Sequence, residues 1–208
     1  FNLGKSINLS REQRKAYIQL VRSKKLDGYK VVFGSIEQIK KYRELYGYKF
    51  VDLDQETDNG FIDMKSKIIH LINPSVETLV HEMIHAATYG SILNYYRDSS
   101  LNSKEVNEAI ERTEKLLNAF LKLSPKELAR LTPDQRAAIS NVKAAIQEPG
   151  NNFDNAPDVA LAKSLNEFMA WSLSNQELIS AFKNVKLPTA LQIAKEVIAI
   201  IKKFFTFK

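Results

Sequence analysis

One stretch near the middle of the chain, ETLVHEMIHAATYG (residues 77–90), constrains the fold more than any other. Its apolar content is that of a buried helix, yet it carries His81, Glu82 and His85 within five positions. Residues four apart lie on one face of an α-helix, so the two imidazoles stand one turn apart, with Glu82 at the rim of that face. Polar groups buried without partners would cost several kcal/mol. The helix therefore needs something that satisfies them.

A zinc ion meets that need. Zn²⁺ binds neutral imidazole nitrogen, and a catalytic zinc keeps three protein ligands and one water. The metal lowers the pKa of that water, and a neighbouring carboxylate takes the proton as the water attacks a carbonyl. We therefore predict Zn²⁺ as the cofactor, His81 and His85 as ligands and Glu82 as the general base. The alternative is a buried helix whose imidazoles are hydrogen-bonded within the protein.

The segment HEMIHAAT (residues 81–88) resembles the HExxH helix of the zincin metallopeptidases. The alanine and threonine after the second histidine resemble the thermolysin-like branch, and no further histidine follows soon after, as the metzincin branch requires. The resemblance implies a zincin-like fold and a zinc endopeptidase that hydrolyses peptide bonds.

The gluzincin type of zincin takes its third ligand from a glutamate on a later helix. Asn166-Glu167, in SLNEFMAWSLSN (residues 164–175), resembles that element and implies Glu167 as the third metal ligand. The alternative is an ordinary solvated glutamate, but its helical neighbours are small or aromatic.

The sequence departs from the thermolysin-like enzymes at two points. Trp171 stands where they carry an aspartate that orients a histidine ligand, and no fourth histidine is present to stabilise the oxyanion. Candidate stabilisers of the transition state are Tyr89, Tyr95 and Tyr96.

His70 is the competing third ligand. It lies in KIIHLI (residues 67–72), where a strand would place it on the same side as Ile68 and Ile72, which also fits a core or edge residue. The resemblance implies that this strand is the sheet edge on which a peptide substrate docks by main-chain hydrogen bonds. The predicted substrate edge consists of Lys67, Ile69, His70 and Leu71.

A narrower resemblance joins GFIDMKSKIIHLINPSVETLVHEMIHAAT (residues 60–88) to the distant NEFMAWSLSNQEL (residues 166–178). The two motifs are similar to metallopeptidase domains embedded in large polyvalent proteins of bacteriophages. This implies a polypeptide substrate, a phage virion or bacterial cytoplasm as location, and a chain embedded in or excised from a longer one, as its start at Phe1 suggests. The alternatives are a zincin-like structural or interaction module with little or no activity, and a polymorphic-toxin protease domain.

Composition excludes other classes of site. The chain has no cysteine, which rules out disulfides and thiolate metal sites. No apolar run approaches the roughly 18 residues of a membrane span. The net charge is +6, but the lysines are spread along the chain without interleaved stacking aromatics. We predict a solvated basic surface and no specific nucleic-acid site.

The pattern of elements indicates one α+β domain over residues 1–208. It comprises a helical appendage (residues 1–27), a small mixed sheet with the HExxH helix (28–97) and a helical part with the third ligand (98–208). Asn73-Pro74 should cap the HExxH helix, with Pro74 at its first position. The predicted strands are 29–35, 48–53 and two within 61–72, and the other predicted helices are 10–24, 35–47, 103–123, 124–131, 132–147, 157–174 and 189–205, with a loop at 148–158.

Overall fold

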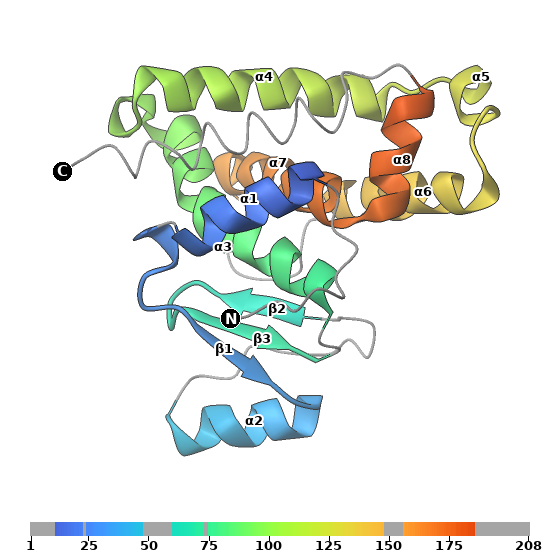
Figure 1. Cartoon of the computed structure of the whole chain (residues 1–208). Helices are drawn as coiled ribbons and strands as arrows, with labels where there is room; N and C mark the ends of the chain where they lie inside the picture. The colour runs from blue at the N-terminus through green and yellow to red at the C-terminus, as the bar shows by residue number, and fades with distance from the viewer. Residues whose placement is uncertain (1–10, 23, 48–59, 73–74, 148–155, 186–208) are drawn as a thin grey trace.

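The structure, a computed structural model, describes residues 11–22, 24–47, 60–72, 75–147 and 156–185. A small three-stranded sheet lies at one end of the molecule, and helices make up the rest (Figure 1). The predicted α+β class is confirmed. None of the described helices combines the length and the apolar character that crossing a membrane requires.

The sheet and its flanking helices follow the local sequence signals. The elements in chain order are α1 (Arg11–Arg22), the short 3₁₀ helix η1 (Lys24–Leu26), β1 (Lys30–Phe33), α2 (Ile36–Leu45), β2 (Gly60–Asp63) and β3 (Ile68–Leu71). α2 begins with a capping box, in which Ser35 and Gln38 each accept the other's backbone N–H through their side chains. It ends before Gly47, whose φ of 67° suits glycine. The predicted strand 48–53 lies outside the described residues.

β3 is the central strand of the described sheet. It pairs in parallel with β1 and antiparallel with β2, and all four of its residues are buried. The predicted substrate edge of Lys67, Ile69, His70 and Leu71 is therefore wrong, because β3 has a hydrogen-bonded neighbour on each side. Lys67 lies in the turn before the strand, with a φ of 54°. The continuous apolar run in KIIHLI is the pattern of an inner strand, which is buried on both faces.

α3 (Val76–Arg97) is the central element of the fold. It packs against the sheet and η1 on one side and against α7 (Pro157–Ser174) on another, as Figure 1 shows. The helix begins after Ser75, whose side chain accepts the Thr78 N–H. The predicted cap, Asn73-Pro74, lies outside the described residues. Eleven residues of α3 are buried, which agrees with its apolar sequence.

The remaining helices form the second half of the molecule. They are η2 (Ser99–Leu101, 3₁₀), α4 (Lys104–Leu121), α5 (Pro125–Leu128), α6 (Pro133–Gln147), α7 and α8 (Gln176–Asn184). Their starts agree with the predicted Ser, Thr and Pro signals, but α8 was not predicted, although Asn175 caps it by accepting the Leu178 N–H. The predicted helix 189–205 and most of the predicted loop 148–158 lie outside the described residues.

Candidate metal centre

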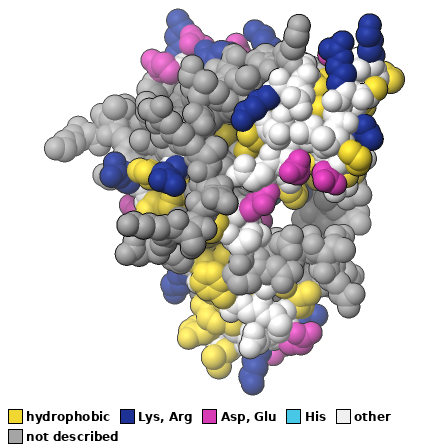
Figure 2. Space-filling view, turned by 45° about the vertical axis from the view of Figure 1, so that its right-hand side comes forward, with side chains coloured by type: hydrophobic (Ala, Val, Ile, Leu, Met, Phe, Trp, Pro, Cys, Tyr) yellow, Lys and Arg dark blue, Asp and Glu magenta, His cyan; other side chains and the backbone are white. Residues whose placement is uncertain are grey.

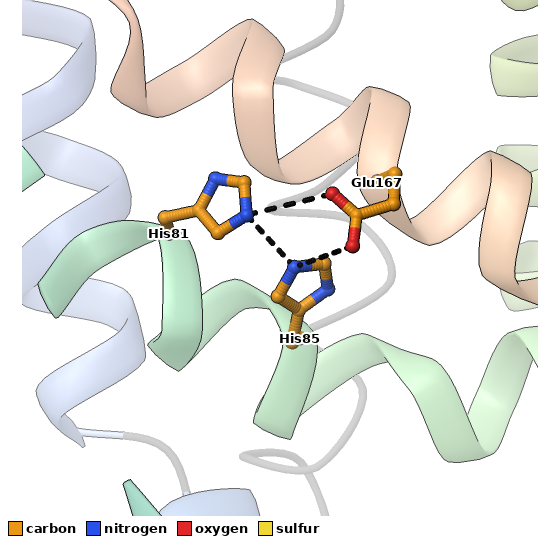
Figure 3. Close-up of side chains that lie close together, drawn as sticks. All are labelled: His81, His85 and Glu167. Carbon is orange, nitrogen blue, oxygen red and sulfur yellow. Dashed lines mark hydrogen bonds and ion pairs between the residues drawn. The ribbon is translucent and has the colours of Figure 1, made fainter. Parts of the chain in front are cut away.

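His81, His85 and Glu167 meet between α3 and α7. The two imidazoles project from α3 toward the carboxylate on α7, as Figure 3 shows. One potential ligand atom from each residue lies within 4.8 Å of the other two. Among the described residues, these three side chains therefore form a group that could hold a metal ion. The structure thus brings together the three residues that the sequence predicts as ligands, although 82 positions separate His85 from Glu167.

The spacing of the three donor atoms fits a zinc ion. His81 Nε2 and His85 Nε2 are 2.9 Å apart. The Glu167 oxygens lie 3.5 Å from His81 Nε2 and 3.3 Å from His85 Nε2. Zinc bonds of about 2.0–2.1 Å at tetrahedral angles put neighbouring ligand atoms about 3.3 Å apart. The donors therefore already stand close to the separations that a tetrahedral zinc requires.

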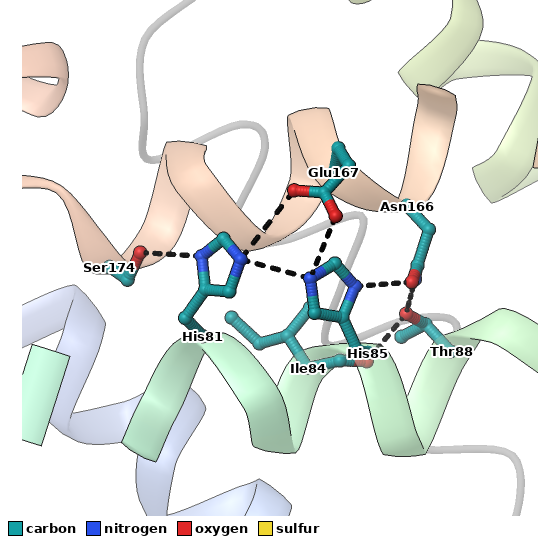
Figure 4. A network of polar contacts seen from close by, with 7 residues as sticks. All are labelled: His81, Ile84, His85, Thr88, Asn166, Glu167 and Ser174. Atoms are coloured by element: carbon teal, nitrogen blue, oxygen red, sulfur yellow. Dashed lines mark hydrogen bonds and ion pairs between the residues drawn. The ribbon is translucent and has the colours of Figure 1, made fainter. Parts of the chain in front are cut away.

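A chain of hydrogen bonds fixes the tautomer of His85 (Figure 4). The Thr88 hydroxyl donates to the Ile84 carbonyl oxygen over 2.7 Å, so it accepts from Asn166 Nδ2, also at 2.7 Å. This turns Asn166 Oδ1 toward His85 Nδ1 at 2.5 Å. Because an amide oxygen only accepts, Nδ1 must carry the proton. The lone pair on Nε2 is then left facing Glu167 and is available for a metal.

His81 is oriented by different groups on α7. Its Nδ1 lies 3.3 Å from Ser174 Oγ, and a hydroxyl can donate or accept, so Ser174 suits either tautomer. The indole of Trp171 meets the imidazole edge-on, with ring centroids 4.7 Å apart. Trp171 stands where thermolysin-like enzymes carry the aspartate that orients a histidine, and here Ser174 contacts His81 Nδ1 instead. The sequence signal was its place two helical turns after Glu167, on the same face of α7.

The electrostatics of Glu167 favour the ionised form that a metal ligand needs. Burial alone would raise the pKa of this carboxyl, but the neighbouring His85 and His81, together with hydrogen bonds from His81 and Trp171, lower it to about 2. The side chains of His81 and His85 are 13% and 9% exposed, whereas that of Glu167 is 32% exposed. Solvent therefore reaches the centre from the Glu167 side.

Two further carboxylates lie on α3 close to the ligands. Glu77 precedes His81 by one turn, and burial raises its pKa, while His81 and the Gln176 backbone N–H act in the opposite direction. Glu82, the predicted general base, is buried on α3 and is not a member of the ligand group. Its predicted role in proton transfer depends on a hydrolytic reaction.

The other candidate residues lie away from the ligand group. Tyr95 and Tyr96 stand ten and eleven residues beyond His85, or about 15 Å along the helix, and the Tyr96 hydroxyl donates to Glu114 on α4. Their predicted role beside a metal-bound substrate is wrong, because one helix cannot bring them nearer. Tyr89 lies one turn after His85 and packs against the core. His70, buried in β3, stacks on Phe61 and is not in the ligand group.

Comparison with known proteins adds one relative. The chain is 30% identical over 208 residues to the virion DNA-directed RNA polymerase of Enterobacteria phage N4. The similarity covers 97% of this chain and 6% of that protein, so the chain spans only a small part of the relative's length. No family model and no solved structure matches the chain.

This relative corrects the predicted function. It is named as an RNA polymerase, so the predicted zinc endopeptidase and the toxin-protease alternative are wrong. The physical reason is that a His-His-Glu set specifies a metal but not a reaction, which depends on groups outside the motif. The coarser expectation of an enzyme agrees with the relative. The predicted location, a phage virion or the bacterial cytoplasm, is confirmed insofar as the relative is a virion protein.

Proposed function

We propose that the chain is a zinc-binding module within a phage virion DNA-directed RNA polymerase polypeptide, in which the metal fastens α3 to α7. The observation that carries the proposal is the convergence of His81 Nε2, His85 Nε2 and a Glu167 oxygen within 4.8 Å. The donor set is the one that the gluzincin resemblance implied. We carry over the ligands from that resemblance and not the hydrolysis.

The types of ligand atom favour zinc over the magnesium ions that polymerase active sites use. Imidazole nitrogen suits zinc, whereas magnesium selects carboxylate, carbonyl and water oxygens. Polymerase active sites hold two metal ions about 3.5–4 Å apart. The ligand group found within the described residues offers two imidazoles and a single carboxylate. We therefore propose that this module stabilises its parent polypeptide and that nucleotide transfer belongs to another part of it.

The surface offers limited support for a nucleic-acid contact by this module. Figure 2 shows lysine and arginine side chains scattered over one face, with acidic side chains gathered near its middle. Affinity for a phosphate backbone comes from several cations that act along one track. We therefore place no nucleic-acid site on this face and assign the module a structural role in the virion polypeptide.

Metal analysis tests the proposal. The chain, purified without chelators, should contain about one zinc ion, because three protein ligands are held at zinc spacing. His81→Ala and Glu167→Gln should lose the zinc, since an amide oxygen is a poor replacement for a carboxylate ligand. Glu111→Gln, an exposed carboxylate on α4, is the matched control and should retain it. A wild-type chain without transition metal would refute the proposal.

The virion assignment has a test of its own. Peptides of this chain should be found by mass spectrometry of purified virions in a polypeptide far larger than 23.7 kDa, together with polymerase peptides. Detection only in host lysate and not in the virion would contradict this part of the proposal.

A further inference from the structure

Trp171 lies beside two of the three residues of the candidate metal centre. It lies one turn after Glu167 on the same face of α7, a spacing at which the indole N–H can reach the Glu167 carboxylate. The same ring meets His81 at 67° between planes, with centroids 4.7 Å apart. Trp171 is the single tryptophan of the chain. One side chain on α7 thus touches His81 on α3 and lies one turn from Glu167 on its own helix.

We infer that Trp171 is the positioning residue of this centre, and that it fixes both the rotation of the Glu167 carboxylate and the plane of the His81 ring. The inference rests on the proposed metal binding and deepens it. Asn166 holds His85 and Ser174 holds the far nitrogen of His81, whereas Trp171 lies beside both His81 and Glu167.

The physical argument concerns the freedom of the glutamate. A glutamate side chain has three rotatable bonds, and fixing them costs conformational entropy. Metal binding by a mobile glutamate is weaker, because the binding free energy must include this cost. Glu167 is the most exposed of the three ligands, so packing restrains it least. A hydrogen bond from a bulky indole, itself packed against the core, supplies the missing restraint. The ring of His81 gains a second restraint from the same group.

Two variants separate the two contacts. Trp171→Phe keeps an aromatic ring beside His81 and removes the N–H donor. Trp171→Gln keeps an N–H that can reach a glutamate four residues earlier on a helix and removes the ring. Outer groups of this kind typically change metal affinity by about 10–100-fold. We expect Trp171→Phe to lower zinc affinity by about that factor and Trp171→Gln to recover part of the loss.

The experiment uses competition with a chromophoric chelator for zinc affinity and the visible absorption of bound Co²⁺ as a report on ligand geometry. Both variants should shift the cobalt bands relative to wild type. Tyr95→Phe, far along α3 from the ligands, is the control and should change neither affinity nor spectrum. In the wild-type chain, bound Co²⁺ should quench the fluorescence of Trp171. This measurement does not depend on the folding of any variant.

The outcomes separate the two levels of the inference. A wild-type chain that binds no metal overturns the proposed function and the positioning role together. A wild-type chain that binds zinc, with Trp171→Phe equal to it in affinity and cobalt spectrum, overturns the positioning role alone. Unquenched emission in the cobalt-loaded wild type also overturns it, because the metal would then lie away from Trp171.

Discussion

At the scale of single residues, groups outside the three candidate ligands orient the candidate centre. Asn166 is the best example, because its amide joins His85 to Thr88 and, through Thr88, to the Ile84 carbonyl. The Ile84 carbonyl oxygen can only accept a hydrogen bond, so the direction of each hydrogen bond in the series fixes the direction of the next. The tautomer of His85 is thus set by the main chain of the same helix.

Replacing Asn166 should therefore weaken metal binding without removing a ligand. Asn166→Ala frees His85 to rotate and to change tautomer, and it leaves the Thr88 hydroxyl without its donor. We expect zinc affinity to fall by about 10–100-fold, measured by chelator competition. Asn118→Ala, an exposed asparagine on α4, is the control and should not change the affinity. Equal affinities for the two variants would show that the hydrogen-bonded chain does not position His85.

At the scale of elements, α7 carries the candidate ligand Glu167 on one face and core residues on another. Phe168 directly follows Glu167 in sequence and is 1% exposed. Its ring lies 5.3 Å from that of Phe120 on α4 and 6.4 Å from that of Phe182 on α8. The packing of three helices therefore holds the backbone from which Glu167 projects toward α3.

Phe168→Ala should destabilise the fold by about 3–5 kcal/mol, the usual cost of removing a buried aromatic side chain. Chemical denaturation of the zinc-loaded chain would measure the loss. Leu161→Ala on the same helix is the matched control, because Leu161 is 52% exposed, and it should change stability by less than about 0.5 kcal/mol. Similar losses for the two variants would contradict the packing described for α7.

At the scale of the whole molecule, the centre joins two parts of the chain that the sequence separates. α3 carries the contacts with the sheet, and α7 carries those with α4, α6 and α8. A second contact between the two helices is the ion pair of Arg97 with Asp158. That pair is at the surface, where ion pairs contribute little to stability. The proposed metal would therefore add the stronger link between the two helices.

Removal of the metal should therefore lower the stability of the whole fold. A ligand that binds only the native state stabilises it by about 2.7 kcal/mol at a free concentration of 100 times its Kd. We expect a chelator to lower the Tm of the wild-type chain and added zinc to restore it. Glu167→Gln should show a low Tm in both conditions. An unchanged wild-type Tm in chelator would show that the metal does not fasten the two helices.

The sequence by itself determined the local features of this protein. Helical periodicity placed His81 and His85 on one face, and the Asn166-Glu167 element named Glu167, which the fold brings to them. Capping residues marked the starts of α2 and α4 correctly. These features depend on hydrogen bonds and side-chain spacing within one element, and the order of residues fixes both.

Only the tertiary structure decided which elements lie side by side. It made β3 the inner strand, brought Ser174 and Trp171 onto His81, and left Tyr96 with Glu114 far from the ligands. Such distances depend on how whole faces pack, and a pattern of residues in one segment carries no information about its partner. For the same reason the two motifs named the residues that meet between α3 and α7 but not the kind of protein that carries them.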